Sequence, residues 1–219
     1  MEYNPTSGSR LLLNGEWEFA EGPDGTLPNS GWKRIRVPHR SREFETNPPD
    51  SGWYHTMLQV PTSWKSKSSR IVLDLGRVRH FGRVHLNGEV VGEHYHMRQP
   101  WRLDLSKRVC PGDVYELMVY THNCKGSYAH PDVDSLSEEA EKALDTRFWY
   151  SSAATIGMEG DVWLCLEPHV RIEDPYIITS VREQTISVEA TVCNESQERF
   201  VGRVSWKVTR AGQTVLELP

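Results

Sequence analysis

The chain has 219 residues, of which 37% are hydrophobic and 25% charged, and its formal net charge is -5. A chain of this length can bury a sizeable core, in one large domain or in one domain and part of another. The weak acidic balance excludes a basic surface for binding nucleic acid or an anionic membrane.

The opening segment, MEYNPTSGSRLLLNG, lacks the basic start and the apolar run of a signal peptide. No stretch approaches the roughly 20 apolar residues that span a bilayer. We therefore expect a soluble, cytoplasmic protein without membrane contact. The four cysteines are scattered without a CxxC pair, which predicts ordinary thiols rather than a zinc site or a disulfide framework.

Short alternating segments separated by turn residues predict an all-β protein with a sandwich or barrel. One face of each predicted strand is apolar: Ile71, Leu73 and Leu75; Val84 and Leu86; Tyr115, Leu117 and Val119. Asn87 and Gly88 stand between two such runs. Because both residues tolerate positive φ, they predict a two-residue hairpin.

One segment, DSLSEEAEKALD, departs from this pattern. Ser135 and Glu138 form a capping box, and an apolar face follows, which predicts a short surface helix. The helix belongs to a long connection over about residues 123–157. Connections of that length in compact domains are usually functional or mobile, and this one leads to Asp161.

The strand predicted over residues 162–168 has Val162, Leu164 and Leu166 on one face. Gly157, Gly160 and Asp161 precede it, and the glycines predict a crowded approach to the sheet.

The remaining residues show two or three further strands, in TISVEATVCN and GRVSWKVTR. They predict the opening of a second sandwich. A complete one needs about 100 residues, and roughly half of that follows residue 168. We expect its strand edges to need partners outside this chain.

Candidate chemical groups are few. His94 and His96 share a strand face, a spacing that can ligate a metal, but without a third ligand they predict a surface or pocket-rim role. Cys124, with His122 and His130 nearby, lacks a nucleophile elbow and is interpreted as a structural thiol. We expect no catalytic residue, metal or cofactor. Trp149 and Tyr150 are candidate sugar contacts because aromatic rings stack on the apolar faces of sugars.

An ordered set of motifs carries a family resemblance: LLLNGEWEF, IRVP, SGWYHTMLQVPTSW, RIVLDLGRV, VHLNGEVVGEH, PWRLDLS, PGDVYELMVYT and GMEGDVWL. Together, over about Leu11 to Pro168, they resemble the N-terminal sugar-binding domain of glycoside hydrolase family 2, the family of β-galactosidases, β-glucuronidases and β-mannosidases. The resemblance implies a galactose-binding-like jelly-roll β-sandwich over residues 1–168 and a partial immunoglobulin-like β-sandwich over residues 169–219. In the family a TIM barrel with the acid/base and nucleophile glutamates follows, and it would be a partner of this region.

The resemblance also implies that Asp161 reaches hydroxyls of the bound sugar, with Asn47 as a second contact. The family's usual motif is G-I-aromatic-R-D-V, and Met158, Glu159 and Gly160 replace its isoleucine, aromatic and arginine positions. An alternative is that Asp161 only caps the strand or a turn.

The expected function is that of the non-catalytic N-terminal sugar-binding region of a retaining β-glycosidase, inactive alone, which binds carbohydrate and which can form homo-oligomers. Alternatives are a stand-alone carbohydrate-binding module and a purely structural or oligomerisation domain.

Overall fold

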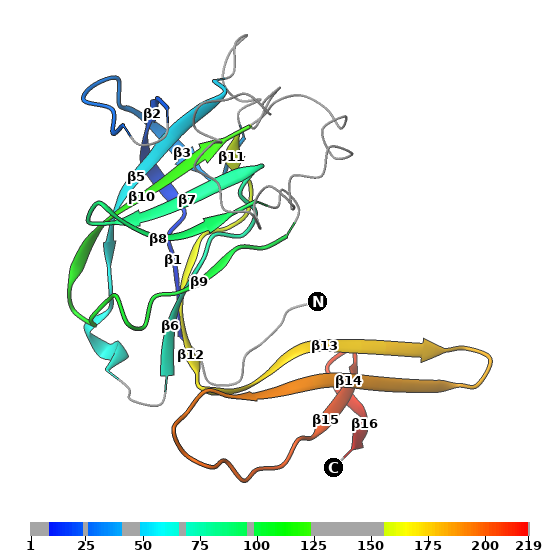
Figure 1. Cartoon of the computed structure of the whole chain (residues 1–219). Coiled ribbons are helices and arrows are strands. Elements are labelled where there is room, and N and C mark those ends of the chain that lie inside the picture. Colours follow the sequence, from blue (N-terminus) through cyan, green and yellow to red (C-terminus); the bar gives the residue numbers. More distant parts are fainter. Residues whose placement is uncertain are drawn as a thin grey trace. The chain divides into compact units, whose positions relative to one another are not determined.

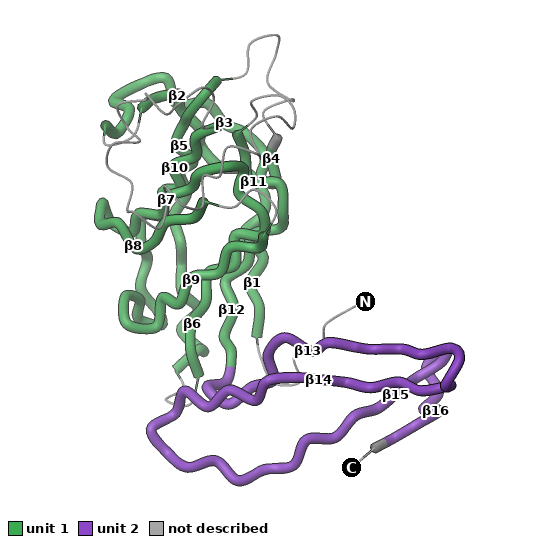
Figure 2. The backbone as a smooth tube through the Cα atoms, turned by 45° about the vertical axis from the view of Figure 1, so that its right-hand side comes forward, with its two compact units in different colours: residues 1–167 green, residues 168–219 purple. Residues whose placement is uncertain are grey.

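The computed structural model describes residues 9–23, 26–40, 49–65, 69–95, 99–123 and 156–218. Nearly all regular structure in these residues is β-strand, and the predicted all-β class is confirmed (Figure 1). The chain divides into two compact units, Met1–Glu167 and Pro168–Pro219 (Figure 2). No helix among the described residues is long and apolar enough to cross a membrane. The helix predicted around Ser135 lies outside the described residues.

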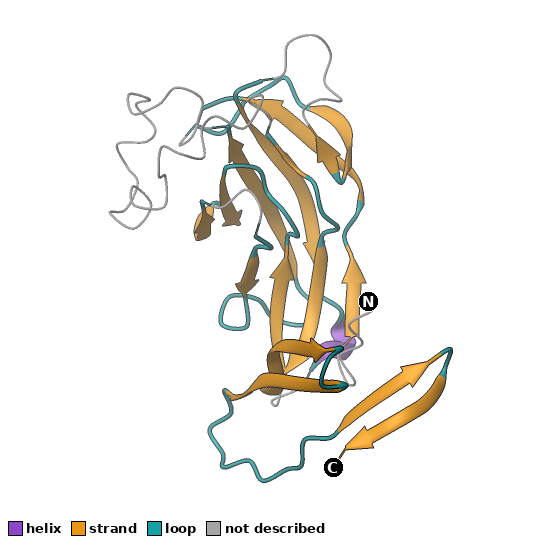
Figure 3. Cartoon of the chain, turned by 90° about the vertical axis from the view of Figure 1, so that its right-hand side faces the viewer, coloured by secondary structure: helices purple, strands orange, loops and turns teal. Residues whose placement is uncertain are grey.

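The first unit is built from two main sheets and a small two-stranded one (Figure 3). The larger sheet has the strand order β3-β2-β5-β10-β7-β8, the four-stranded sheet β1-β12-β6-β9, and β11 pairs with β4. The bounds are β1 (Ser9–Leu12), β2 (Gly15–Glu21), β3 (Lys33–Val37), β4 (His39–Arg40), β5 (Ser51–Gln59), η2, a 3-10 turn (Thr62–Trp64), β6 (Ser69–Asp74), β7 (Phe81–Leu86), β8 (Glu89–His94), β9 (Arg102–Asp104), β10 (Val114–His122), β11 (Gly157–Met158) and β12 (Trp163–Pro168).

The apolar core lies between the inner faces of the two main sheets. It contains Phe19 and Tyr54 from the six-stranded sheet and Leu73 and Leu164 from the four-stranded sheet, all with no exposed surface. The predicted alternation is confirmed, because the inward residues of β6, β7, β10 and β12 belong to this cluster or pack against it. Burial of this kind supplies most of the stability of a sandwich.

The hairpin between β7 and β8 is the predicted one. Asn87 and Gly88 form the turn with φ of 49° and 83°. Asn87 also accepts a hydrogen bond from the Glu116 N–H at 2.8 Å on the neighbouring strand β10. The turn is therefore fixed by backbone geometry and by a side-chain contact.

The second unit consists of two hairpins, β13 (Val170–Ser180) with β14 (Thr185–Asn194) and β15 (Trp206–Arg210) with β16 (Gln213–Leu218). The run predicted from Gly202 becomes a strand only at Trp206. In the first hairpin, Ile177 lies opposite Val188, and Ile172 lies opposite Val192. This predicted apolar face is partly open, since Ile177 is 48% and Val192 49% exposed.

Charge pairing closes the base of the first hairpin. Arg171 donates to both carboxylate oxygens of Glu195, at 2.9 and 2.8 Å, and to Glu173 at 2.6 Å. These bonds raise the pKa of Arg171 above the ordinary value of a guanidinium group, with the Glu195 hydrogen bond as the main cause. The guanidinium thus holds the start of β13 to the end of β14.

Candidate functional site

Asp161 lies directly before β12, where the chain enters the four-stranded sheet. Its side chain is exposed, and its Oδ1 accepts a hydrogen bond from Asn14 Nδ2 at 2.8 Å. Asn14 Oδ1 in turn accepts the Val162 N–H at 2.9 Å, and the Leu13 N–H donates to the Val162 carbonyl at 2.8 Å. The last residue pair of β1 and β12 is Leu12 with Trp163. The Leu13 backbone and then the Asn14 side chain continue the bonding to Val162.

The local sequence explains why the chain turns away at Asn14. Gly15 follows with a φ of 132°, a conformation that favours glycine. Trp17, 3% exposed in the core, donates its indole N–H to the Leu13 carbonyl at 2.8 Å. Sequence reasoning did not single out Asn14, although the Asn-Gly pair between two strands was a signal of a turn that a side chain could stabilise.

The crowded approach predicted by the glycines is present. Gly160 crosses Gly76, whose φ is 57°, and a Cβ added to Gly160 would lie 2.9 Å from both the Gly76 Cα and the Arg77 nitrogen. Real Cβ atoms do not approach backbone so closely. A glycine is therefore required where the family motif usually has an arginine.

The two preceding motif positions also have structural roles. Met158 is fully buried in the core, so it serves as the apolar residue that the motif requires there. Glu159 Oε1 accepts a hydrogen bond from Arg79 Nε at 2.7 Å, with 5% of the Glu159 side chain and 25% of the Arg79 side chain exposed. Backbone bonds join the same segments, from Glu159 N to the Arg77 carbonyl at 2.7 Å and from Arg79 N to the Gly157 carbonyl at 2.9 Å.

His80 follows Arg79 in a left-handed conformation, with φ of 59°. The pKa of His80 is lowered to about 4, mainly by burial and secondly by the Arg79 charge, while the Glu159 charge opposes the shift. His80 is therefore neutral near pH 7. Its Nε2 is buried without a hydrogen-bond partner among the described residues.

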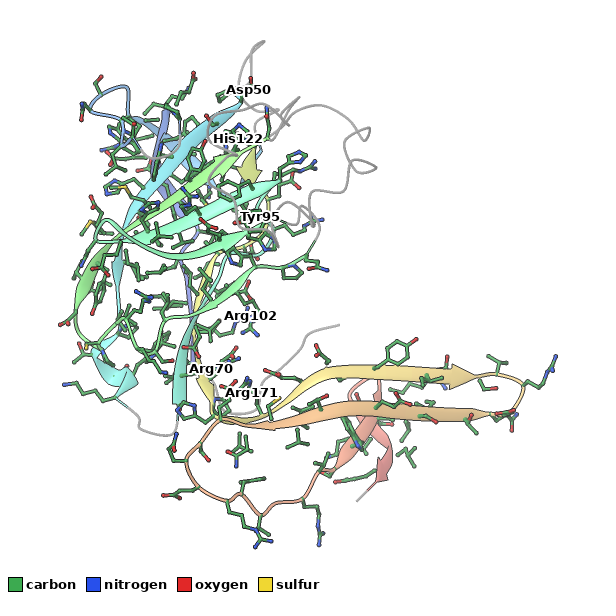
Figure 4. The ribbon with its side chains drawn as sticks, viewed as in Figure 1. Asp50, Arg70, Tyr95, Arg102, His122 and Arg171 are labelled. Carbon is green, nitrogen blue, oxygen red and sulfur yellow. The ribbon has the colours of Figure 1, made fainter. Side chains whose placement is uncertain are left out.

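Buried polar groups gather where β5 begins and β10 ends. Asn123 donates its side chain to Asp50 Oδ1 at 2.6 Å and its backbone N–H to the Asp50 carbonyl at 2.9 Å. His39 Nδ1 lies 3.0 Å from the Tyr54 hydroxyl. Asp50 and His122 lie at this end of the sandwich (Figure 4). Buried polar groups in native proteins are hydrogen-bonded, and the Asn123–Asp50 bonds join the end of β10 to the start of β5.

The outer face of the six-stranded sheet has an aromatic layer of its own. Trp53, Phe81, Met118 and Tyr120 form a second buried cluster, with Trp32 and Tyr95 packed against it. The Trp53 and Tyr120 rings are 5.1 Å apart. At the edge of this layer, Arg83 donates to Glu93 at 2.6 Å, and the Tyr95 hydroxyl donates to the other Glu93 oxygen.

Of the predicted sugar contacts, Asp161 is among the residues that the structure describes. Asn47, Trp149 and Tyr150 lie outside the described residues, as do His96, Cys124 and His130. Of the surface or pocket-rim role predicted for His94, the surface part is wrong. The residue is 8% exposed, and its ring stacks on Trp101 with 5.2 Å between the ring centroids, because it occupies the inward face of β8. In the described ranges, no three His, Cys, Asp or Glu side chains are grouped as metal ligands.

No protein-family model matches the chain. In sequence it is 27% identical over 217 residues to a β-galactosidase of Erwinia tasmaniensis, covering 85% of this chain and 19% of that protein. It is 24% identical over 156 residues to a β-glucuronidase of Felis catus, covering 68% of this chain and 24% of that protein. The predicted resemblance to glycoside hydrolase family 2 is confirmed.

Solved family 2 structures share the fold. A β-glucuronidase from an uncultured Clostridium sp. superimposes with a TM-score of 0.71 at 20% identity, over 100% of this chain and 39% of that one. A Faecalibacterium prausnitzii β-glucuronidase gives a TM-score of 0.67 at 20% identity, over 89% and 37%. The chain thus spans a minor part of each family 2 relative.

Proposed function

We propose that this chain is the non-catalytic N-terminal sugar-binding region of a retaining family 2 β-glycosidase. The observation that carries the proposal is that all of the chain matches the fold of a β-glucuronidase while covering 39% of its length. A TIM barrel in the C-terminal part of the parent protein supplies the catalytic carboxylates. The substrate is a β-linked carbohydrate.

Charge pairing in the first unit supports a non-catalytic role. A retaining mechanism needs two carboxyl groups about 5.5 Å apart across the sugar, one of them able to act as a nucleophile. Here Glu167 lies between Arg70, at 3.1 Å, and Arg102, and Glu159 pairs with Arg79. Arg70 and Arg102 are labelled in Figure 4. Carboxylates neutralised by guanidinium groups in this way hold strands together and are poor nucleophiles.

Asp161 is the proposed sugar contact within this region. It is exposed, one carboxylate oxygen is held by Asn14, and Oδ2 accepts no hydrogen bond from the described residues. A fixed carboxylate with one available oxygen suits a sugar hydroxyl donor. Asn47, Trp149 and Tyr150 are proposed as further contacts on the basis of the sequence alone.

The proposal is tested by comparing the protein encoded by the complete reading frame with residues 1–219. We expect the complete protein to hydrolyse p-nitrophenyl β-D-glucuronide or β-D-galactoside and the shorter chain to hydrolyse neither. Hydrolysis by pure residues 1–219 that a point substitution within them abolishes would contradict the non-catalytic assignment. A reading frame without a barrel would contradict the glycosidase assignment.

A stand-alone carbohydrate-binding module is the second candidate, and the aromatic layer on the outer face of the six-stranded sheet is the surface on which its sugar would have to stack. However, Trp53 and Tyr120 are each 1% exposed, so their rings are not open to a sugar. Calorimetric titration of residues 1–219 with oligosaccharides distinguishes the two. Binding by residues 1–219 that is unchanged in Asp161→Asn would favour the module, because the proposed sugar contact would then not account for it.

A further inference from the structure

Asn14 contacts two consecutive residues at the proposed sugar contact, the Asp161 carboxylate at 2.8 Å and the Val162 N–H at 2.9 Å. We propose that Asn14 is a positioning residue, which fixes the Asp161 side chain so that its second oxygen is ready to accept a sugar hydroxyl. The inference rests on the proposed function, because positioning matters only if Asp161 contacts the sugar.

The amide is the side chain that suits both contacts. It has a donor end and an acceptor end, and Asn14 uses the donor on the carboxylate and the acceptor on the backbone N–H. An aspartate in its place keeps the acceptor but sets a second carboxylate against Asp161. An alanine removes both bonds. Neither replacement would hold the Asp161 carboxylate in its present orientation.

Fixing the carboxylate in advance has a cost and a benefit. An exposed side chain loses rotamer freedom when it is held in one orientation. If Asn14 imposes this cost during folding, it does not have to be met when sugar binds. The surrounding backbone reinforces the effect, because the Gly76–Gly160 crossing leaves the residue before Asp161 no room to move toward Gly76.

Asn87 provides a matched control. Its Oδ1 also accepts a backbone N–H, that of Glu116 at 2.8 Å, at a turn that a positive φ defines. No described carboxylate accepts from its donor end. Asn87→Asp therefore keeps the side-chain bond that Asn87 makes to Glu116, whereas Asn14→Asp keeps the bond to Val162 and loses the bond to Asp161.

The test compares Asn14→Asp, Asp161→Asn, the swap Asn14→Asp/Asp161→Asn, and Asn87→Asp in the complete protein. Hydrolysis of the p-nitrophenyl β-glycoside that the parent accepts and the melting temperature are measured for each. We expect kcat/KM to fall about 10- to 100-fold in each of the first three variants and to stay at the parental value in Asn87→Asp.

The swap separates positioning from a merely structural role. It rebuilds the side-chain hydrogen bond with donor and acceptor exchanged. We therefore expect the melting temperature to fall in Asn14→Asp and to return to the parental value in the swap, while kcat/KM of the swap stays low. We also expect the swap to be no slower than Asp161→Asn alone, since Asn14 has no carboxylate left to orient.

The other outcomes each overturn something definite. Parental kcat/KM in Asp161→Asn would remove the proposed sugar contact and the role of Asn14 with it. A slow Asp161→Asn beside a parental Asn14→Asp would overturn the role of Asn14 alone. Recovery of both the melting temperature and kcat/KM in the swap would show that the hydrogen bond has only a structural role, and would overturn the positioning role of Asn14.

Discussion

Gly76 and Gly160 pass so closely that a Cβ on Gly76 would lie 2.8 Å from the Gly160 Cα, and a Cβ on Gly160 would lie 2.9 Å from the Gly76 Cα. The contact joins the end of β6 to the entrance of β12. It leaves no room for a side chain at either position, and the neighbouring atoms are backbone that cannot rotate away.

Gly160→Ala is therefore expected to destabilise the first unit by about 1 to 3 kcal/mol, the usual cost of overpacking a rigid contact. Urea unfolding of residues 1–219 measures this change. Gly22→Ala serves as the control, because its added Cβ would lie 3.3 Å from the Pro28 side chain and 3.7 Å from the Trp53 side chain, and would meet no backbone atom within 4 Å among its three nearest neighbours. Equal stability of both variants would show that the crossing can relax.

The Glu159–Arg79 pair gives a second prediction. Glu159→Gln leaves a guanidinium that is 25% exposed without its charged partner. Because removing one member of a buried pair costs more than the pair itself contributes, we expect a loss of about 1 to 3 kcal/mol. Glu16→Gln, in the exposed Glu16–Arg34 pair at 3.7 Å, should change stability by less than about 0.5 kcal/mol. Similar losses in both variants would place Glu159 among the solvated charges.

Sequence patterns predicted the faces of the strands well and their long-range partners poorly. Alternation placed Leu117 and Val119 on one face of β10, and turn chemistry placed the hairpin at Asn87 and Gly88. These are local signals. The Asn14–Asp161 bond joins residues 147 apart, and periodicity carries no information about such partners.

Two interpretations needed the fold before they could be decided. Alternation in GEHYH did not show which face of β8 is inward, and the register that sets His94 opposite Gly82 puts its ring beside Trp101. Similarly, the sequence identified Glu159 only as the replacement of the motif's aromatic residue. The antiparallel pairing of Gly157–Glu159 with Arg77–Arg79 turned it into the partner of a guanidinium.

His80 predicts a pH dependence of stability. Its pKa falls from 6.5 to about 4 on folding, so between these values the unfolded chain binds the proton and the folded chain does not. The contribution of His80 is fully present above pH 6.5 and is lost as the pH falls toward 4, by up to about 3 kcal/mol. His80→Asn, which tolerates the positive φ, should lose less stability than the parent between pH 7.5 and pH 4.5. Urea unfolding at both pH values measures the difference, and identical losses would contradict the shift.

The last prediction contrasts backbone protection in the two units. β14 pairs with β13 alone among the described strands, and its apolar face is half-open, with Ile186 51% exposed. β5 pairs along its length with β10 and also with β2, and Tyr54 and Leu58 are fully buried. Because local opening is easiest where few apolar contacts must break, amides of β14 should exchange with deuterium faster than those of β5 in the same sample of residues 1–219. Equally slow exchange in both strands would mean that β14 acquires a partner in solution, and its protection should then fall on dilution if that partner is a second copy.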